Sequence, residues 1–388
     1  MSIREPDLSP LDLNPTDRVA GTGEPSVVFG GADSAIVGWG VRDVVTTRRS
    51  DDPDLDAEVR GRLADDECAV GALSFRGDDP ATFVVPASQQ RRAVTGLGPG
   101  PTTPHRVRRH EHPSATAYAR SVARALEHLE REPELRKVVL GRWLRLELEP
   151  ALTRSEVVAG LARTAGLARL FAVPVPATLA PTEESSYLVG ASPELLVSRR
   201  GRSVRALPLA GSAPRGRTPE EDRLAAEELL DSAKNRAEHG LVVESVAAAL
   251  GPACTELSVP APTLVATDSM WHLATDVRGH LDRPDLAPGA LGLAQLLHPT
   301  PAVCGTPTER ARELVAALEP PRGPMTGAVG WTSRDGDGTF VVTIRAGLLH
   351  DHRLDLFAGA GIVTGSDPAS ETAETGAKLR TMLRGVGL

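Results

Sequence analysis

The sequence predicts an α+β fold built on antiparallel sheets. Short apolar segments typical of strands outnumber the helical patterns, and many of them are separated by hairpin-length turns. The 388 residues, of which 41% are hydrophobic, suffice to bury a large core in one big domain or two smaller ones. The sequence contains neither a repeat of fixed period nor a low-complexity tract.

The first 110 residues alternate short apolar runs with clusters of Gly, Pro and Asp, which favours short strands joined by turns. Ser26–Gly30 and Ala35–Val41 are two such strands, and the proline-rich Pro99–Pro104 is a candidate linker. Ser114 then caps a predicted helix that ends at Pro133. Apolar residues recur along this helix at helical spacing, namely Tyr118, Val122, Ala125, Leu126 and Leu129.

Beyond this helix, strands and helices alternate. The predicted strands are Lys137–Leu140, Tyr187–Gly190, Leu195–Ser198, Phe340–Ile344 and Leu354–Phe357. A long helix is expected from Thr218 to about Leu250, with Thr218 as the N-cap, Pro219 at the first helical position and Glu221 completing a capping box. The last helix follows Asp367 and ends near Gly385.

Composition excludes several classes of protein. The net charge of −8 disfavours nucleic acids and anionic membranes as partners. No apolar run is long enough to span a bilayer, and the charged, proline-rich N-terminus is not a secretory signal. The three cysteines, Cys68, Cys254 and Cys304, are far apart, which favours a reducing cytoplasm over a disulfide framework or a zinc site.

Glu238 is the first candidate for a chemical role. In the long helix it precedes Leu241 and Val242 and follows Leu230 at helical spacing, so it lies on a partly apolar stripe. A carboxylate that faces a core needs a partner, a metal ion or a raised pKa. The alternative is an ordinary salt bridge with Lys234, four residues earlier.

The last helix carries Glu371, Glu374 and Lys378 on one face. Two carboxylates three residues apart repel each other unless a cation lies near them, and magnesium suits a few carboxylates combined with substrate oxygens. The alternative is an exposed Glu374–Lys378 pair.

Residues 357–367 form a glycine-rich stretch. Gly359, Gly361 and Gly365 permit close approach of the backbone to a ligand, although Thr364 removes the dinucleotide-binding pattern and a plain tight turn is the alternative. Arg345 ends the preceding strand, where it is placed either to bind a carboxylate or simply to face solvent.

Three further residues have ambiguous surroundings. Lys137 opens a strand of β-branched residues, where it is either a desolvated base or a solvated strand-end lysine. Glu194 follows a proline and is either a buried proton donor or a turn residue. His272, like His298, lies in an apolar context that is typical of a core histidine.

Taken together and in order, the motifs resemble the chorismate-utilising enzymes, which include isochorismate, salicylate, anthranilate and aminodeoxychorismate synthases. The stretches that carry the resemblance are KVVLGR, YLVGASPELLV, PLAGSAPRGRTPEED, KNRAEHGLVVE, WHLATDV, HPTPAVCG, GAVGW, TFVVTIRAG and FAGAGIVTGSDP with ETGAKL. They cover about residues 115–388. Residues 1–110 resemble the family loosely, as the N-terminal part of the same fold, and 111–388 form the expected catalytic core.

The resemblance implies a single α+β domain of two packed antiparallel sheets flanked by helices, with the site in a cleft. It implies that Glu238 and Glu374 bind Mg²⁺, with Glu371 and Lys378 supporting that cage. It further implies that Arg345 and the backbone at Gly359 and Gly361 hold the pyruvyl carboxylate of chorismate. The remaining expected substrate contacts are Gly211, Ser212, His272 and Ala302.

Two positions indicate which reaction to expect. Family members that use water as the nucleophile have a lysine in the KVV strand as its base, where ammonia-using members have glutamine, and this chain has Lys137. Aminodeoxychorismate synthase attacks the ring with the lysine of PIKGT, whereas this chain has Ala210 in that place. The resemblance therefore implies an isochorismate synthase, an isomerase with Lys137 as base and Glu194 as acid.

Salicylate synthase, which also eliminates pyruvate, is the alternative, although Ala302 and Val303 look more like the isochorismate pattern. Met325-Thr326 replace the usual Tyr-Ala, Asn235 a frequent Asp and Ser212 a frequent Thr, without removing a proposed ligand or acid–base residue. We expect no glutaminase subunit, and a monomer is compatible with the sequence. The sequence does not specify whether the product feeds siderophore, menaquinone or other synthesis.

Overall fold

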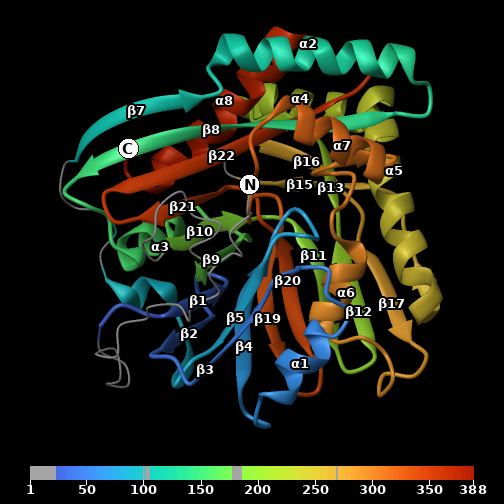
Figure 1. The fold of residues 1–388 in the computed structure, drawn as a ribbon. Helices are drawn as coiled ribbons and strands as arrows, with labels where there is room; N and C mark the ends of the chain where they lie inside the picture. Colours follow the sequence, from blue (N-terminus) through green and yellow to red (C-terminus); the bar gives the residue numbers. More distant parts are fainter. Residues whose placement is uncertain (1–22, 99, 101–104, 177–185, 268–269) are drawn as a thin grey trace, which may run out of the picture.

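The computed structural model describes residues 23–98, 100, 105–176, 186–267 and 270–388. Within these ranges the chain forms two large antiparallel sheets, a small third sheet and flanking helices (Figure 1). The candidate linker Pro99–Pro104 lies outside the described residues except for Gly100. No helix in the described part of the chain is both long and apolar enough to cross a membrane.

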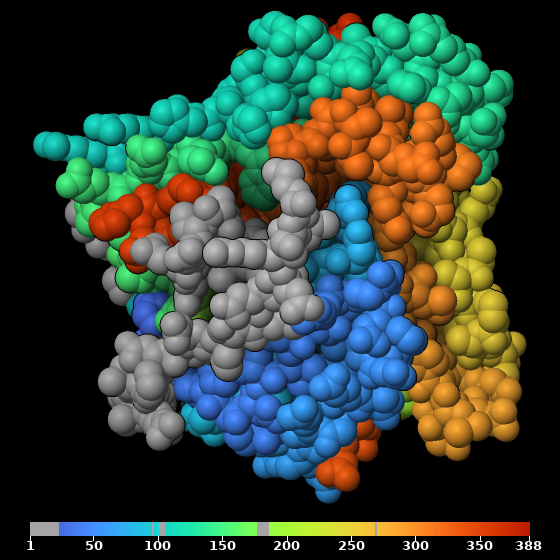
Figure 2. Space-filling model, in the orientation of Figure 1, coloured from blue at the N-terminus to red at the C-terminus, as the bar shows by residue number. Residues whose placement is uncertain are grey.

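The first sheet has ten strands and carries the lysine-containing strand in its interior. In spatial order it consists of β18 (Gly305–Thr306), β8 (Lys137–Glu149), β22 (Arg353–Ile362), β21 (Ala346–His350), β10 (Ser186–Ser192), β9 (Arg169–Val175), β1 (Val27–Gly30), β2 (Ala35–Trp39) and β6 (Ser88–Arg92), while β7 (Arg106–His112) pairs with the later part of β8. β7 is almost wholly exposed and projects from the body of the protein (Figure 2).

The second sheet has nine strands. In order these are β14 (Cys254–Ser258), β17 (Val277–Leu281), β12 (Ser203–Leu207), β11 (Leu195–Arg200), β20 (Gly338–Val342), β19 (Ala328–Ser333), β4 (Cys68–Leu73), β5 (Ala81–Val85) and β3 (Asp43–Thr47). The third sheet consists of β13 (Leu209–Pro214), β16 (Met270–Ala274) and β15 (Thr263–Ala266). This small sheet is not expected from the sequence.

The described α-helices are α1 (Leu55–Gly61), α2 (Ala115–Arg131), α3 (Arg154–Ala162), α4 (Pro219–Asp231), α5 (Ala233–Leu250), α6 (Ala290–Leu297), α7 (Thr308–Leu318) and α8 (Pro368–Gly385). They lie outside the two sheets. Buried residues of α1, α5 and α6 pack on the second sheet, and those of α3 and α8 pack on the first. α2 and α7 pack around the start of β8.

The core between the two large sheets is formed by facing residues of both. Phe29, Phe171 and Leu188 from the first sheet share one buried cluster with Val329 and Val341 from the second. Because each sheet also buries its outer face under helices, both sheets are apolar on two sides. The fold therefore confirms the predicted class of two packed antiparallel sheets flanked by helices.

The helix capped by Ser114 is also confirmed. The Ser114 side chain accepts a hydrogen bond from the Ala117 amide at 3.3 Å, and α2 ends at Arg131, before Pro133. All five apolar residues of the predicted stripe face the core. Tyr118, Val122, Ala125 and Leu129 are buried and Leu126 is partly buried.

The prediction of one long helix from Thr218 to Leu250 is wrong. The helix breaks at Ser232, whose ψ of 112° is extended and whose side chain accepts from the Asn235 amide to begin α5. Leu230 therefore does not continue the stripe of Glu238 and is 37% exposed. The N-terminal cap at Thr218 is present, but Glu221 bonds to the Arg217 amide, so the capping box is incomplete.

Several predicted strand bounds are wrong. The strands predicted at β8, β10, β11 and β22 are too short, Ala35–Val41 is too long because β2 ends at Trp39, and Phe340–Ile344 is displaced by two residues. β8 runs on from Leu140 to Glu149, and β22 continues through Gly359 and Gly361 to Ile362, so these glycines lie in a strand. β20 ends at Val342 instead of Ile344. The extension of β8 and β22 follows from their mutual pairing over ten residue pairs, a long-range contact that local patterns do not show.

Candidate active site

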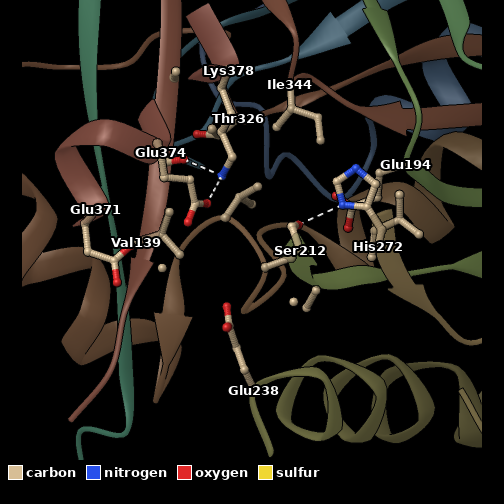
Figure 3. A pocket seen from close by; sticks show the side chains of 18 of the residues that line it. Val139, Glu194, Ser212, Glu238, His272, Thr326, Ile344, Glu371, Glu374 and Lys378 are labelled. Carbon is tan, nitrogen blue, oxygen red and sulfur yellow. Dashed lines mark hydrogen bonds and ion pairs between the residues drawn. The ribbon is translucent and has the colours of Figure 1, made fainter. Parts of the chain in front are cut away.

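A cavity of about 340 Å³ lies between the starts of β8 and α5, the ends of β22 and the small sheet, and one face of α8. Figure 3 shows Glu238 pointing into it from one side, Glu371, Glu374 and Lys378 on another, and Glu194 with His272 across from them. The cavity brings together the thirteen predicted site residues, which are Lys137, Glu194, Gly211, Ser212, Glu238, His272, Ala302, Arg345, Gly359, Gly361, Glu371, Glu374 and Lys378. Their individual roles remain predictions.

Lys137 reaches the cavity because strand side chains alternate between two faces. Lys137 and Val139 line the cavity, whereas Val138 and Leu140 point into the apolar cluster under α2. The Lys137 side chain is only 1% exposed, and its Nζ lies 2.7 Å from Oε1 of Glu238. Lys137 is therefore desolvated and ion-paired, and it is not a solvated strand-end lysine.

Glu238 stands at the start of the buried stripe of α5, which continues with Val242, Val246 and Leu250. Its partner is Lys137 and not Lys234, the alternative considered from the sequence. Burial by itself raises the pKa of Glu238, but the charge and hydrogen bond of Lys137 outweigh burial, so the pKa lies below its ordinary value. Glu238 is therefore an ionised carboxylate inside the cavity.

Glu194 lies between β10 and β11 and is only 3% exposed. Burial raises its pKa to about 7, even though a backbone hydrogen bond from Leu209 and the charges of Lys137 and Arg345 act in the opposite direction. A carboxyl group with this pKa is substantially protonated near neutral pH. Glu194 can therefore donate a proton to a bound molecule, which a solvated turn residue would not do.

Ser212 and His272 face each other across the pair β13 and β16. The Ser212 Oγ lies 2.8 Å from Nδ1 of His272, and burial lowers the pKa of His272 to about 3, with the charges of Arg345 and Lys378 adding to the effect. His272 is thus neutral. In the described part of the chain its buried Nε2 has no hydrogen-bond partner, so this atom is available to a ligand.

Arg345 adopts a left-handed backbone conformation with φ of 51° directly before β21. Such a conformation is uncommon for a residue other than glycine and often marks a functional position. Burial lowers the pKa of Arg345. No ion pair of its guanidinium is found among the residues that the structure describes, so the group is available for a ligand carboxylate.

α8 contributes the second set of carboxylates. Lys378 Nζ lies 2.6 Å from Oε1 of Glu374 and donates to the Gly359 carbonyl at 2.8 Å. The Glu374–Lys378 pair expected as the alternative is therefore formed, but it lies in the cavity wall and not on an exposed face. Burial raises the pKa of Glu371, and the neighbouring charge of Glu374 raises it further.

The glycines of β22 and β13 leave room for these groups. A Cβ at Gly361 would lie 2.7 Å from Oε1 of Glu238 and 2.9 Å from Cε of Lys137. At Gly211 the φ of 78° itself requires glycine, and a Cβ there would lie 3.1 Å from Asn235. Close approach of the backbone at Gly361 is thus real, but it accommodates the Lys137–Glu238 pair.

The carboxylates fit a magnesium ion that is completed by a ligand. Among the described residues, no three His, Cys, Asp or Glu side chains form a ready-made metal cage. Glu238, Glu371 and Glu374 nevertheless line one cavity, and burial together with the charge of Glu374 acts against ionisation of Glu371, an effect that a bound cation would relieve. Magnesium commonly takes one or two protein carboxylates and obtains its other oxygens from water or substrate.

Several cavity residues are missed by the sequence reasoning. They are Val139, Pro193, Leu209, Lys234, Ser370, Thr326, Ile344, Phe357 and Ala358. Strand alternation from Lys137 is the signal that could have found Val139. Thr326 is noted in the sequence only as part of the Met325-Thr326 replacement, and it enters the cavity wall through a left-handed backbone conformation with φ of 58°.

The chain belongs to the chorismate-binding enzymes. The family model described as "Chorismate binding enzyme" matches residues 74–387. The isochorismate synthase DhbC of Bacillus subtilis (strain 168) is 48% identical over 256 residues, and the match spans 66% of this chain and 64% of that protein. The putative isochorismate synthase MenF of Mycobacterium tuberculosis (strain ATCC 25618 / H37Rv) is 40% identical over 371 residues, which cover 94% of this chain and 97% of that one.

A solved structure has the same fold. It is that of the putative 2,3-dihydroxybenzoate-specific isochorismate synthase DhbC from Bacillus anthracis, which matches with a TM-score of 0.86 and 38% identity over 94% of this chain and 97% of that chain. The family expected from the ordered motifs is thereby confirmed.

Proposed function

We propose that this enzyme is a magnesium-dependent isochorismate synthase, an isomerase that converts chorismate to isochorismate. The observation that carries the proposal is that a desolvated lysine and a carboxyl group with a pKa near 7 share one cavity. A base and an acid poised in this way suit the addition of water at one ring carbon and the loss of hydroxide at another. The isochorismate synthases among its relatives support the same reaction.

In the proposed reaction, Lys137 accepts a proton from a water molecule as the water oxygen bonds to C2 of the ring. Both ring double bonds shift by one position, and the C4–oxygen bond breaks as Glu194 donates its proton to the departing hydroxyl group. One water enters and one leaves, so the atoms balance. Transfer of a proton from Lys137 back to Glu194 through solvent restores both residues.

The other residues would hold the substrate. Arg345, with no ion-pair partner among the described residues, is suited to the pyruvyl carboxylate, and the neutral His272 offers Nε2 for a hydrogen bond. Bound at Glu238 and Glu374, with Glu371 in support, magnesium would neutralise the ring carboxylate and draw electron density from the ring. Nζ of Lys137 lies 2.7 Å from Oε1 of Glu238, and the proposed assignment of Glu238 to the metal would leave this amine to the attacking water.

The direct test is incubation of the protein with chorismate and Mg²⁺, followed by chromatographic identification of the product. Isochorismate supports the proposal. Fluorescent salicylate released together with pyruvate would instead establish the salicylate synthase alternative. Anthranilate formed only with ammonia would refute both.

A further inference from the structure

Arg322 and Glu319 form a buried ion pair just outside the cavity. Their side chains are 1% and 3% exposed, and Nε of Arg322 bonds to Oε1 of Glu319. Neither residue lines the cavity. Burying such a pair gives little net stability, because both groups lose their hydration. The two side chains instead hold other groups in place.

The guanidinium of Arg322 bonds to three segments of the cavity wall. It donates to the carbonyl oxygens of Val139 and Val303 at 2.7 Å each, and to Oγ1 of Thr326 at 3.1 Å. All three of these residues line the cavity, although they come from distant parts of the chain. Together with Glu319 these make four acceptors, which a planar fork of five N–H donors can satisfy and the three donors of an ammonium group cannot.

The pair also closes a gap in the first sheet. On one edge of β8, β18 pairs with Lys137 and Val138, and β7 pairs only from Trp143 onward. Between them, Arg322 bonds to the Val139 carbonyl, while Oε2 of Glu319 accepts from the Gly141 amide at 2.7 Å. The ion pair thus takes the place of a neighbouring strand between Val139 and Gly141.

The backbone conformation of Thr326 depends on hydrogen bonds such as the one from Arg322. Thr326 is a β-branched residue in the left-handed region, with φ of 58°, a conformation that such residues rarely adopt. Its amide donates to the Thr343 carbonyl at 2.8 Å, and its Oγ1 donates to the Met325 carbonyl at 2.6 Å while accepting from Arg322. Arg322 therefore helps to hold a strained residue of the cavity wall.

We propose that Arg322, oriented by Glu319, is a positioning residue for the reaction. It fixes the segment of β8 that presents Lys137, together with the walls at Val303 and Thr326. The inference rests on the proposed function, in which Lys137 is the base. Displacement of a reacting group by about 1 Å can cost about a hundredfold in rate, so loosening this segment should lower kcat more than it raises KM.

Arg322→Lys tests the inference against a matched control, Arg199→Lys. Arg199 is also buried, in β11, and donates to the carbonyl oxygens of Gly201, Pro284, Ala287 and Pro288, but it does not line the cavity. Both variants should unfold at a lower temperature. We expect Arg322→Lys to lower kcat at least about tenfold with KM nearly unchanged, and Arg199→Lys to keep kcat within about twofold. Equal kcat values in the two variants would overturn the inference.

A second pair of variants distinguishes a loss of positioning from a loss of stability. Arg322→Met leaves Glu319 buried without its partner, whereas the double variant Arg322→Met/Glu319→Gln removes both charges and should recover much of the lost thermal stability. We expect kcat of the double variant to stay low. Recovery of kcat together with stability would make the pair purely structural and would overturn the inference. Wild-type protein that fails to convert chorismate would refute the proposed function instead.

Discussion

Lys137 and Glu238 meet through an ion pair of 2.7 Å that joins the start of β8 to helix α5. Gly361, on the strand beside Lys137, leaves the space that both side chains occupy. The residues proposed as base and metal ligand are thus packed against each other. Changes at any of these three positions should affect binding and turnover together.

Gly361→Ala should damage the site without disturbing the fold. Its Cβ would meet Oε1 of Glu238 at 2.7 Å and Cε of Lys137 at 2.9 Å, closer than real contacts allow, so both side chains must shift. We expect turnover of chorismate to fall by about tenfold or more, as measured by initial rates. Gly240→Ala in α5 is the control, because nothing lies within 4 Å of its Cβ and alanine should stabilise the helix by about 1 kcal/mol.

Lys137→Gln should abolish the attack of water while the protein stays folded. Glutamine keeps most of the side-chain volume but cannot accept the proton, and loss of a general base costs about 10²–10⁴-fold in rate. Initial rates measured beside circular dichroism spectra test this, with the exposed neighbour changed in Arg136→Gln as the control. Turnover near the wild-type level would refute the assignment of the base.

Glu194 should impose a pH limit on the reaction. Burial raises its pKa to about 7, and the acid form is the active one, so kcat/KM should fall about tenfold per pH unit above about pH 7. The raised pKa also means that the folded protein binds this proton more tightly than the unfolded chain. Its contribution to stability is therefore full below about pH 4.5 and is lost as the pH rises to about 7.

Glu194→Gln separates these two effects. Glutamine cannot donate the proton, so turnover should drop by at least about a hundredfold, and the residual rate should no longer decline around pH 7. The free energy of unfolding, measured by denaturant titration between pH 4.5 and pH 7, should lose the part of its slope that Glu194 causes. A decline near pH 7 that persists in this variant would point to a different group.

The sequence predicts the fold class and the residues of the site better than it predicts their partners. Ordered motifs place Glu238 and Lys137 in one cavity, yet helical spacing offers Lys234 as the partner of Glu238. The actual partner lies about a hundred positions away in the chain, beyond the reach of any local pattern. The helical spacing of apolar residues also continues across Ser232, so the sequence predicts one long helix. Apolar spacing alone does not reveal that Ser232 ends one helix and caps the next.

The burial of Arg322 also depends on contacts that are distant in the sequence. Arg322 lies in a short proline-rich loop after α7, where an arginine normally faces solvent. Its burial depends on carbonyl groups of Val139 and Val303, which the topology of β8 and β18 leaves without strand partners. The burial of Arg322 can be predicted only when the unpaired backbone groups along this sheet edge are known.

The carboxylates of α5 and α8 should bind Mg²⁺ jointly. Glu238→Ala and Glu374→Ala should each weaken Mg²⁺ binding measured by titration calorimetry with the protein alone, since each removes one of the few carboxylates available to the ion. Glu244→Ala is the matched control, because Glu244 is an exposed residue of the same helix as Glu238. The two cavity variants also free Lys137 or Lys378 from its ion pair, which adds unpaired positive charge to the cavity and weakens cation binding further. Unchanged affinity in both variants would mean that the ion binds elsewhere, while weakening by Glu374→Ala alone would assign it to α8 and leave Glu238 solely as the partner of Lys137.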